Sequence, residues 1–448
     1  MIELVFPAPQ LAKLRNQLAH HRLESAAILL ATPVRRDERD IRLLVQTMAL
    51  PAEADYLRRT ATDVELRPEF GLPLEKTAAR KGWSLIYVHT HPNQDNLPSF
   101  SYVDDRTEAR LAPYARMRSA DTPHVALLLG KERLVARQLG TSTPVRVLEI
   151  GDHIHHAYDP AADSDELEIA HDRQIRAFGK AGQRRLRRVR VVVVGLGGTG
   201  SVVAQQLAHL GIDEFLLIDT QVIDESNLNR VVGAIPNDKD KILKVDVAER
   251  VIKAIRPGAQ VTKVSKDVLS PGVGAQIAGF DFVFCCTDSN GSRHLLNQLA
   301  YQYLVPTIDL GVSITPNVSL TDLQLWAHVR LLAPGQACLH CTGSLDPDQV
   351  RRDLMAEPDR RRDPYFNKNV QVIQPAVISL TSLAASTATT MFLSVVVGIP
   401  APARHLTLQL HRGIMKPLTS TPQAGCHYCG DTAIASGGAV QLPEQADA

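Results

Sequence analysis

The stretch VVVVGLGGTGS, residues 191–201, decides the fold class of the larger part of this chain. The run of valines is typical of a buried strand, and the glycines after it open a helix predicted over Thr199–Leu210. Glycine lets the backbone approach a phosphate closely, and the free amide groups at a helix N-terminus attract its negative charge. The residues therefore predict a nucleotide site, without separating ATP from a nicotinamide cofactor. The glycines expected at this site are Gly195, Gly197, Gly198 and Gly200.

Beyond residue 201, apolar runs typical of strands alternate with segments typical of helices. The predicted strands are Glu214–Ile218, Gln260–Val264 and Phe280–Cys286, and Leu243–Ile255 is a predicted helix. This alternation predicts a doubly wound, mainly parallel, Rossmann-like α/β sheet.

The first 150 residues form a separate pattern. Short apolar runs such as Ser25–Leu30 and His124–Leu129 alternate with helical stretches such as Tyr102–Leu111, which predicts a mixed α/β domain over residues 1–150. Residues 151–172 are polar and acidic and are predicted to form a linker whose end can be helical. The second domain is then expected over residues 173–448.

Charge and hydropathy exclude several classes of partner. The 448 residues carry 49 Lys and Arg against 48 Asp and Glu, so we expect no nucleic acid and no membrane surface as partner, and the basic run at 184–190 is interpreted as a helix face. The N-terminus lacks the pattern of a secretory signal, so a cytoplasmic location is expected. The uncharged segment 376–397 is predicted to be a buried helix rather than a membrane span.

Charged residues after the predicted strands distinguish between nucleotides. Asp219 directly follows the strand 214–218, a position where a carboxylate can bind ribose hydroxyls. Asn227 and Arg230 are three residues apart, Lys244 lies at the start of a helix, and Asp288 follows the strand 280–286. Cations for a triphosphate and a carboxylate for Mg²⁺ are required for nucleotidyl transfer and not for hydride transfer. Taken one at a time, these residues could equally be solvated charges or a helix cap.

This combination resembles the ThiF/MoeB superfamily, which includes the ubiquitin-activating enzymes. The lead-in also matches, with Arg173-Gln174-Ile175, Phe178-Gly179, Gln183 and Leu186 before the glycine loop. The resemblance implies adenylation, with Mg-ATP, of the C-terminal glycine carboxylate of a ubiquitin-like or sulfur-carrier protein. It assigns ribose to Asp219, phosphates to Asn227, Arg230 and Lys244, and Mg²⁺ to Asp288. It further implies a homodimer in which Arg173 acts on the partner's site. Gln221 and Val231 depart from the family pattern, which has an acidic residue and Gln there.

Two CxxC pairs predict a structural metal site. Their thiolates are expected to form a closed tetrahedral zinc site, with a redox dithiol or unrelated buried cysteines as the alternatives. The ThiF/MoeB resemblance implies a structural zinc at matching positions. The pairs are Cys338 with Cys341 and Cys426 with Cys429. Cys285 and Cys286 are predicted to be core residues, and no cysteine lies between 341 and 426, so the sequence leaves open whether any thiol accepts the activated carrier.

A second metal site is predicted in the first domain. The strand Leu85–Val88 leads into His89 and His91, and Asp104 lies at the start of the helix that follows. Two histidines at i and i+2 project from the same side of an extended chain, and the carboxylate completes three ligands. Such a set leaves a coordination position open, as zinc-dependent hydrolysis requires.

HTHP followed by SYVD resembles the JAMM motif of the JAB/MPN metallopeptidases, which cleave isopeptide or peptide bonds after ubiquitin-like proteins. The resemblance implies a catalytic zinc on His89, His91 and Asp104. It makes Glu24 the general base and Ser101 the group that stabilises the oxyanion. Ser99 and Asp105 are the competing serine and aspartate, ranked lower.

Together these patterns predict a bifunctional enzyme that adenylates a carrier protein and also processes or deconjugates it. The alternative is an adenylyltransferase for a peptide or another carboxylate or carbamoyl substrate, with the first domain as a non-catalytic binding platform. A dehydrogenase that uses NAD is the weakest reading.

Overall fold

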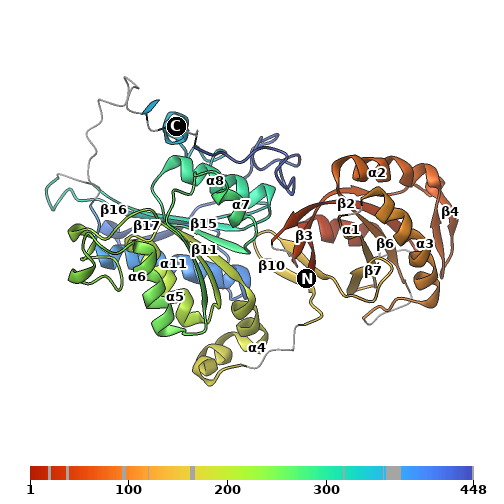
Figure 1. The fold of residues 1–448 in the computed structure, drawn as a ribbon, viewed down its shortest axis with the longest axis horizontal. Coiled ribbons are helices and arrows are strands. Elements are labelled where there is room, and N and C mark those ends of the chain that lie inside the picture. Colours follow the sequence, from red (N-terminus) through yellow and green to blue (C-terminus); the bar gives the residue numbers. More distant parts are fainter. Residues whose placement is uncertain are drawn as a thin grey trace. The chain divides into compact units, whose positions relative to one another are not determined.

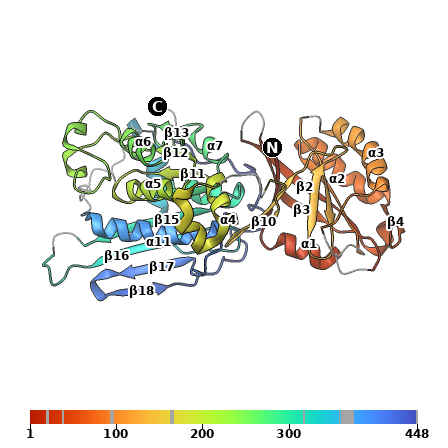
Figure 2. The same ribbon diagram turned by 90° about the horizontal axis from the view of Figure 1, so that it is seen from below.

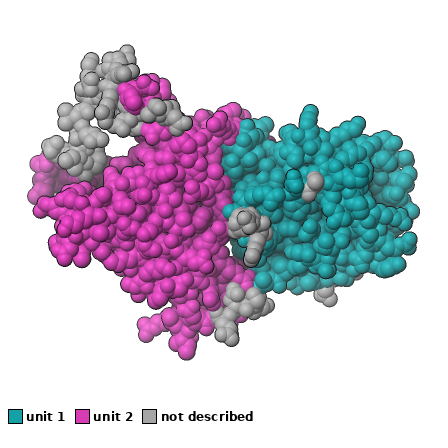
Figure 3. Space-filling model, viewed as in Figure 1, with its two compact units in different colours: residues 1–162, 302–304, 432–439 teal, residues 163–301, 305–431, 440–448 magenta. Residues whose placement is uncertain are grey.

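The computed structural model describes residues 1–18, 22–36, 40–92, 97–119, 121–161, 167–315, 318–356, 358–359 and 375–445. The chain divides into two compact units, shown in teal and magenta in Figure 3. Unit 1 consists of Met1–Ala162 with residues 302–304 and 432–439. Unit 2 consists of Asp163–Tyr301, Val305–Asp431 and Val440–Ala448.

Unit 1 contains a mixed sheet with the strand order β10-β9-β1-β3-β2-β6-β7-β8. Pairing is parallel for β1 with β3, β1 with β9 and β6 with β7, and antiparallel elsewhere. The strands are β1 (Ile2–Pro7), β2 (Ala26–Arg35), β3 (Ile41–Ala49), β6 (Ser84–Thr90), β7 (Val125–Leu129), β8 (Leu134–Gln138), β9 (Arg146–Ile150) and β10 (Ile154–Tyr158). A separate hairpin joins β4 (Tyr56–Arg59) to β5 (Val64–Leu66).

Both faces of this sheet are covered by helices. Side chains alternate along β2, so that Leu29 packs in one apolar core with α1 (Gln10–Leu18), while Ile28 packs in another with helices α2 and α3 (Figure 2). Helix α2 spans Pro68–Lys81 and α3 spans Tyr102–Arg118. The candidate metal centre of unit 1 lies in the space between α2, α3 and the sheet.

The predicted linker over residues 151–172 was wrong in part. Ile154–Tyr158 forms β10, which pairs antiparallel with β9. Ile154 is buried, and Ala157 and Tyr158 pack against the unit 1 core. Residues 162–166 of the predicted linker lie outside the described residues. Helix α4 (Asp172–Arg188) then begins at the predicted domain start.

Unit 2 contains the predicted doubly wound sheet, with strand order β13-β12-β11-β14-β15-β16-β17-β18. The first five strands in this order are parallel and the last three run antiparallel. The strands are β11 (Arg190–Val194), β12 (Glu214–Ile218), β13 (Gln260–Val264), β14 (Phe282–Cys285), β15 (Thr307–Ile314), β16 (Leu325–Leu332), β17 (His405–Gln409) and β18 (Ile414–Pro417). Strand order reverses between β11 and β14, and ligands of such sheets bind beyond the carboxyl ends at this point.

Helices cover both faces of the unit 2 sheet (Figure 1). Their bounds are α5 (Gly198–Leu210), α6 (Lys244–Ile255), α7 (Val273–Ile277), α8 (Asn290–Gln302), α9 (Pro347–Leu354) and α11 (Ile378–Val396). Helix α11 is long and apolar enough to cross a membrane by length and composition. It packs against α5, β15 and β16, and its Phe392 lies 4.9 Å from Phe282, ring centre to ring centre. The predicted helix is confirmed, and half of it is buried within unit 2.

Candidate functional sites

The glycine loop of unit 2 lies at the point where the strand order of the sheet reverses. Gly195 follows β11 with φ of 85°, and α5 begins at Gly198. A Cβ added to Gly195 would come within 2.8 Å of the carbonyl oxygen of Cys286, which follows β14. The loop therefore packs between the carboxyl ends of β11 and β14, with the N-terminus of α5 open to an anion.

The glycines of this loop have different physical roles. A Cβ at Gly200 would lie 1.8 Å from the Gly195 carbonyl oxygen, so this position cannot carry a side chain. A Cβ at Gly197 would meet nothing within 4 Å. Gly200 is therefore required for the turn itself, and Gly197 leaves open space in front of it. At Gly198 the added atom would lie 3.3 Å from the Cδ atom of Arg230.

Asp219 and Asn227 are both engaged with neighbouring groups. Asp219 accepts hydrogen bonds from the backbone N–H of Leu196 at 2.7 Å and of Gln221 at 2.8 Å, which ties the end of β12 to the glycine loop. Asn227 is buried, and its side-chain amide donates to Asp224 at 2.8 Å. Each carboxylate oxygen of Asp219 keeps a further lone pair that can accept a hydrogen bond, whereas the Asn227 amide holds its local turn.

Lys244 is the buried cation of this site. It lies at the start of α6, and its Nζ donates to the Oε1 atom of Gln221 at 2.5 Å. Burial and the nearby charge of Arg230 lower the pKa of Lys244, and the carboxylates of Asp219 and Asp288 oppose that change. Gln221, which stands where the family pattern has an acidic residue, therefore positions the lysine without neutralising it.

Arg293 is a charged residue near this site that the sequence analysis did not identify. It lies on α8, and its Nε atom is 3.2 Å from Oδ1 of the buried Asp309. Burial alone would lower the pKa of Arg293, but the charges of Asp309 and Asp288 raise it. Its position five residues after Asp288, on the next helix, was the feature of the sequence that could have identified it. Asp288 itself is exposed, in position to reach a solvated cation.

Arg173 is exposed near the start of α4. Among the residues that the structure describes, it forms no hydrogen bond or ion pair. Val231, by contrast, is buried in a small apolar core with Ile223 and Val247, which explains why an apolar residue replaces the Gln of the family pattern.

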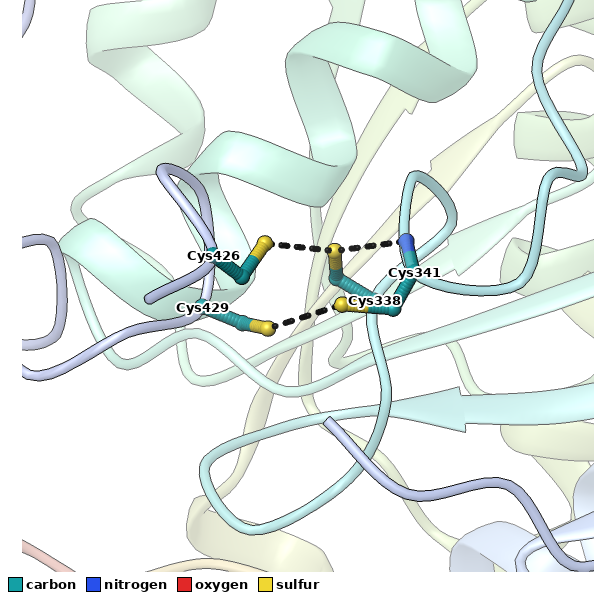
Figure 4. Close-up of side chains that lie close together, drawn as sticks. All are labelled: Cys338, Cys341, Cys426 and Cys429. Carbon is teal, nitrogen blue, oxygen red and sulfur yellow. Dashed lines mark hydrogen bonds between the residues drawn. The ribbon is translucent and has the colours of Figure 1, made fainter. Parts of the chain in front are cut away.

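The two CxxC pairs meet in space (Figure 4). The Sγ atoms of Cys338 and Cys426 are 3.7 Å apart and those of Cys341 and Cys429 are 3.5 Å apart, with all four within 4.8 Å of one another. None forms a disulfide. The backbone N–H of Gln423 donates to Cys341 Sγ, which favours a thiolate. Four sulfurs in this arrangement fit tetrahedral zinc.

Cys285 and Cys286 are different. Cys285 is 1% exposed, and burial raises its pKa to about 12. Burial also raises the pKa of Cys286 well above its usual range. The prediction that these are core residues is confirmed for Cys285, and neither thiol is poised to act as a nucleophile.

Comparison with known proteins identifies the family of the region that contains the glycine loop. The model of the ThiF family matches residues 171–427, more than half of the chain. The chain belongs to the ThiF family. Its relatives include the molybdopterin-synthase adenylyltransferases of Salmonella typhimurium, 34% identical over 32% of this chain and 59% of that protein, and of Escherichia coli, 31% identical over 41% of this chain and 70% of that protein.

The chain thus spans about three fifths of the length of the Salmonella relative. The solved structure of Escherichia coli MccB with MccA-N7isoASN shares 19% sequence identity and a TM-score of 0.47, over 59% of this chain and 76% of that one. The ThiF match begins at residue 171 and so leaves unit 1 to be interpreted from its own geometry.

Unit 1 brings His89, His91 and Asp104 together, with one ligand atom of each within 4.8 Å of the others. His89 lies on β6 and His91 just beyond it, and the His89 Nε2 atom is 3.0 Å from Oδ1 of Asp104. The Nε2 atom of His91 is 3.5 Å from Oδ2 of Asp104. Burial alone would raise the pKa of Asp104, but the hydrogen bond and charge of His89 hold it well below its usual range. Two imidazoles and a carboxylate at these separations fit a zinc ion with an open position.

Asp104 is positioned by the start of α3. Ser101 is the N-cap of the helix, its Oγ accepts from the Asp104 N–H, and its own N–H donates to Asp104 Oδ2 at 2.6 Å. This capping box points the carboxylate at the histidines. The competing Asp105 instead forms an ion pair with Arg137 at 2.7 Å. Ser99 is exposed two residues before the cap.

Glu24 lies just before β2 and faces the same centre. Its Oε1 atom is 3.7 Å from Nε2 of His91, and its side chain is nearly buried. Burial raises the pKa of Glu24 to about 7, against the opposing charge of His89. A carboxylate with this pKa can accept a proton near neutral pH. Glu24, Ser101 and the three ligand residues line one cavity of about 910 Å³.

Proposed function

We propose that the ThiF region, residues 171–427, adenylates the C-terminal carboxylate of a ubiquitin-like or sulfur-carrier protein with Mg-ATP. The observation that carries the proposal is the buried Lys244 held beside Arg230 and Asp288 at an open glycine loop in a chain of the ThiF family. Relatives support the class of substrate, since one is a SAMP-activating enzyme E1 of Haloferax volcanii, 34% identical over 48% of its length.

The residues of this region suit each part of the reaction. The loop amides and the N-terminus of α5 receive phosphates, while Arg230 and Lys244 neutralise charge that develops as pyrophosphate leaves. Asp288 would hold Mg²⁺, which shields the phosphates. The carboxylate of the carrier attacks the α-phosphate, and its adenylate forms. Arg173 is proposed to reach this site from the second protomer of a homodimer.

We further propose that unit 1 is a zinc-dependent peptidase or isopeptidase that exposes that carboxylate. His89, His91 and Asp104 would hold the metal, which supplies Lewis acidity. Glu24 takes the proton from the attacking water and returns it to the leaving amine. The Ser101 hydroxyl is available to stabilise the oxyanion. The three metal ligands and the general base Glu24 all line the same cavity. This arrangement supports a hydrolytic enzyme over a domain that only binds the carrier.

ATP–pyrophosphate exchange tests both halves together. The purified full chain is assayed with ubiquitin-fold proteins that end at their terminal glycine and with versions extended beyond it. We expect immediate exchange with the trimmed form, and exchange with the extended form only when Glu24 is intact. Glu24→Gln is compared with Glu69→Gln, which removes an exposed carboxylate outside the cavity.

The outcomes separate the alternatives. Exchange with a short peptide but with no carrier protein would favour an adenylyltransferase for peptides. Processing of the extended carrier by Glu24→Gln would refute the hydrolytic half and leave the adenylating half standing.

A further inference from the structure

The cavity beside the two histidines of unit 1 continues between α2, α3 and the sheet. Tyr87 and His89 are two residues apart on β6, so their side chains point to the same face, about 7 Å apart along the strand. The cavity therefore extends from the candidate metal centre along β6 toward Tyr87. None of the JAMM-motif residues lies in this part.

An acidic side chain faces this extension. Glu75 of α2 lines the cavity and is 8% exposed, and its Oε2 atom has no hydrogen-bond partner among the described residues. Arg58, a cation that also lines the cavity, pairs with Asp63 at 2.6 Å and with Glu65 at 3.1 Å. A buried carboxylate oxygen without a partner is costly, which indicates that a donor from outside the chain completes it.

The hydroxyl group of Tyr87 also lacks a hydrogen-bond partner among the described residues. Its Oη atom is buried. A tyrosine hydroxyl can accept a hydrogen bond as well as donate one. The hydroxyl of Tyr114, also in the cavity wall, is occupied by Arg118, whose Nη2 atom donates to it at 2.6 Å. Glu75 and Tyr87 thus remain as a pair of acceptors.

Apolar side chains form part of the cavity wall and pack in the same core as Tyr87, although Glu108 and Arg110 line the cavity as well. The apolar residues are Ile28, Leu66, Leu111, Ala126 and Leu139. On α2, Gly71 leaves space one turn before Glu75, since an added Cβ would lie 3.6 Å from Glu75 Oε1 and 3.4 Å from Ile28 Cδ1. Apolar side chains beside a carboxylate and a phenol suit a ligand side chain with a methylene stem and a cationic head.

We infer that Glu75 and Tyr87 form a specificity subsite, the α2–α3 subsite, that binds a basic side chain of the polypeptide presented to the candidate metal centre. The inference rests on the proposed hydrolytic function and names part of its substrate. The guanidinium of arginine and the ammonium of lysine share the required chemistry. The planar, weakly hydrated guanidinium can donate to both acceptors at once.

Binding, rather than cleavage, tests the subsite. Full-length Glu24→Gln protein is titrated with fluorescently labelled peptides that end in Gly-Gly and carry arginine, lysine or norleucine at one upstream position at a time. We expect arginine or lysine at one position to bind at least about tenfold more tightly than norleucine, the usual range of a charge-assisted hydrogen bond. Adding Glu75→Gln should remove this preference and leave norleucine binding unchanged.

Two further variants keep the test decisive. Glu65→Gln changes a carboxylate in the cavity wall that is exposed and paired with Arg58, so it should retain the preference. Tyr87→Phe removes one acceptor without the charge and should reduce the preference in part. Equal binding of arginine and norleucine peptides by the unsubstituted subsite, or equal losses for both in Glu75→Gln, would overturn the inference.

Failure of the proposed function gives a different result. If basic peptides bind through Glu75 but the chain with intact Glu24 cleaves no extended carrier, the subsite stands and the hydrolytic proposal falls. If extended carriers are cleaved and the preference for basic residues is absent, the hydrolytic proposal stands and the subsite falls.

Discussion

Cys338 and Cys426 hold their Sγ atoms 3.7 Å apart although 88 residues separate them in the chain. Cys338 lies in the segment after β16, and Cys426 lies in the segment after β18. The contact therefore joins the segments that follow two of the antiparallel strands of the unit 2 sheet. A metal held by both pairs would tie these segments together and stabilise the fold, because the sites do not exist in the unfolded chain.

Replacing Cys426 with Ser should therefore remove one zinc per chain and lower the free energy of unfolding by more than about 4 kcal/mol. Metal content by mass spectrometry and urea unfolding measure the two effects. His427→Ala is the matched control, since this exposed side chain lies between the cysteines and should keep the metal. Full zinc content in Cys426→Ser would contradict the assignment.

Gly200→Ala and Gly197→Ala should fail in different ways. The Cβ at Gly200 would lie 1.8 Å from the Gly195 carbonyl oxygen, so the loop must rearrange and unit 2 should lose several kcal/mol of stability. The Cβ at Gly197 meets nothing within 4 Å, so the protein should fold normally. It should bind ATP at least about tenfold more weakly, because the methyl group occupies space in front of the loop. Calorimetry and nucleotide titration measure stability and affinity, and normal ATP affinity in Gly197→Ala would place the phosphates elsewhere.

The proposed action of Arg173 across a dimer is testable by complementation. Arg173→Ala and Lys244→Ala should each lower exchange activity at least about a hundredfold, since each removes a cation from the phosphates. After the two variants are mixed and subunits exchange, half of the dimers contain one complete site, so activity should return to about a quarter of the original. Lys239→Ala, which removes an exposed lysine paired with Glu225, should behave as the original protein. No recovery on mixing would show that Arg173 acts within its own chain or not at all.

His405 should make unit 2 less stable in mild acid. Burial and the nearby charges of Arg330 and His328 lower its pKa from the usual 6.5 to about 4. The unfolded chain therefore binds a proton at a pH where the folded chain does not, and stability decreases as pH falls from about 6.5 toward 4. Because the ring is partly exposed, we expect a loss on the order of 1 kcal/mol. Thermal unfolding at pH 7 and pH 5 measures it, and His405→Gln should show a smaller drop. An equal drop in both proteins would assign the effect to other groups.

Much of the fold followed from local pattern. The valine run and the glycines predicted β11 and the start of α5. The apolar runs of unit 1 predicted β6 and β7 to within two residues, whereas β2 continues five residues beyond the predicted run. Such signals are local because the backbone geometry of a strand or a tight turn restricts residues that are neighbours in sequence. The spacing of the His and Cys pairs is local in the same sense.

Other features required the tertiary structure. Polar residues in the predicted linker gave no sign of β10, because its partner β9 supplies the hydrogen bonds. The sequence ranked Asp104 above Asp105, but only the folded structure shows the capping box of α3 that directs Asp104 toward the histidines. The contact of Lys244 with Gln221 likewise joins two elements that only folding brings together.

Local patterns in the sequence determined the alternation of strands and helices from β11 to β14, together with the glycine, lysine and cysteine positions of the family. The folded structure was needed to show that Glu75 of α2 faces the same cavity as Tyr87 of β6. The physical reason is that such contacts depend on how whole elements pack. Packing is the sum of many weak contacts between residues that are distant in sequence, so no short stretch of sequence encodes it.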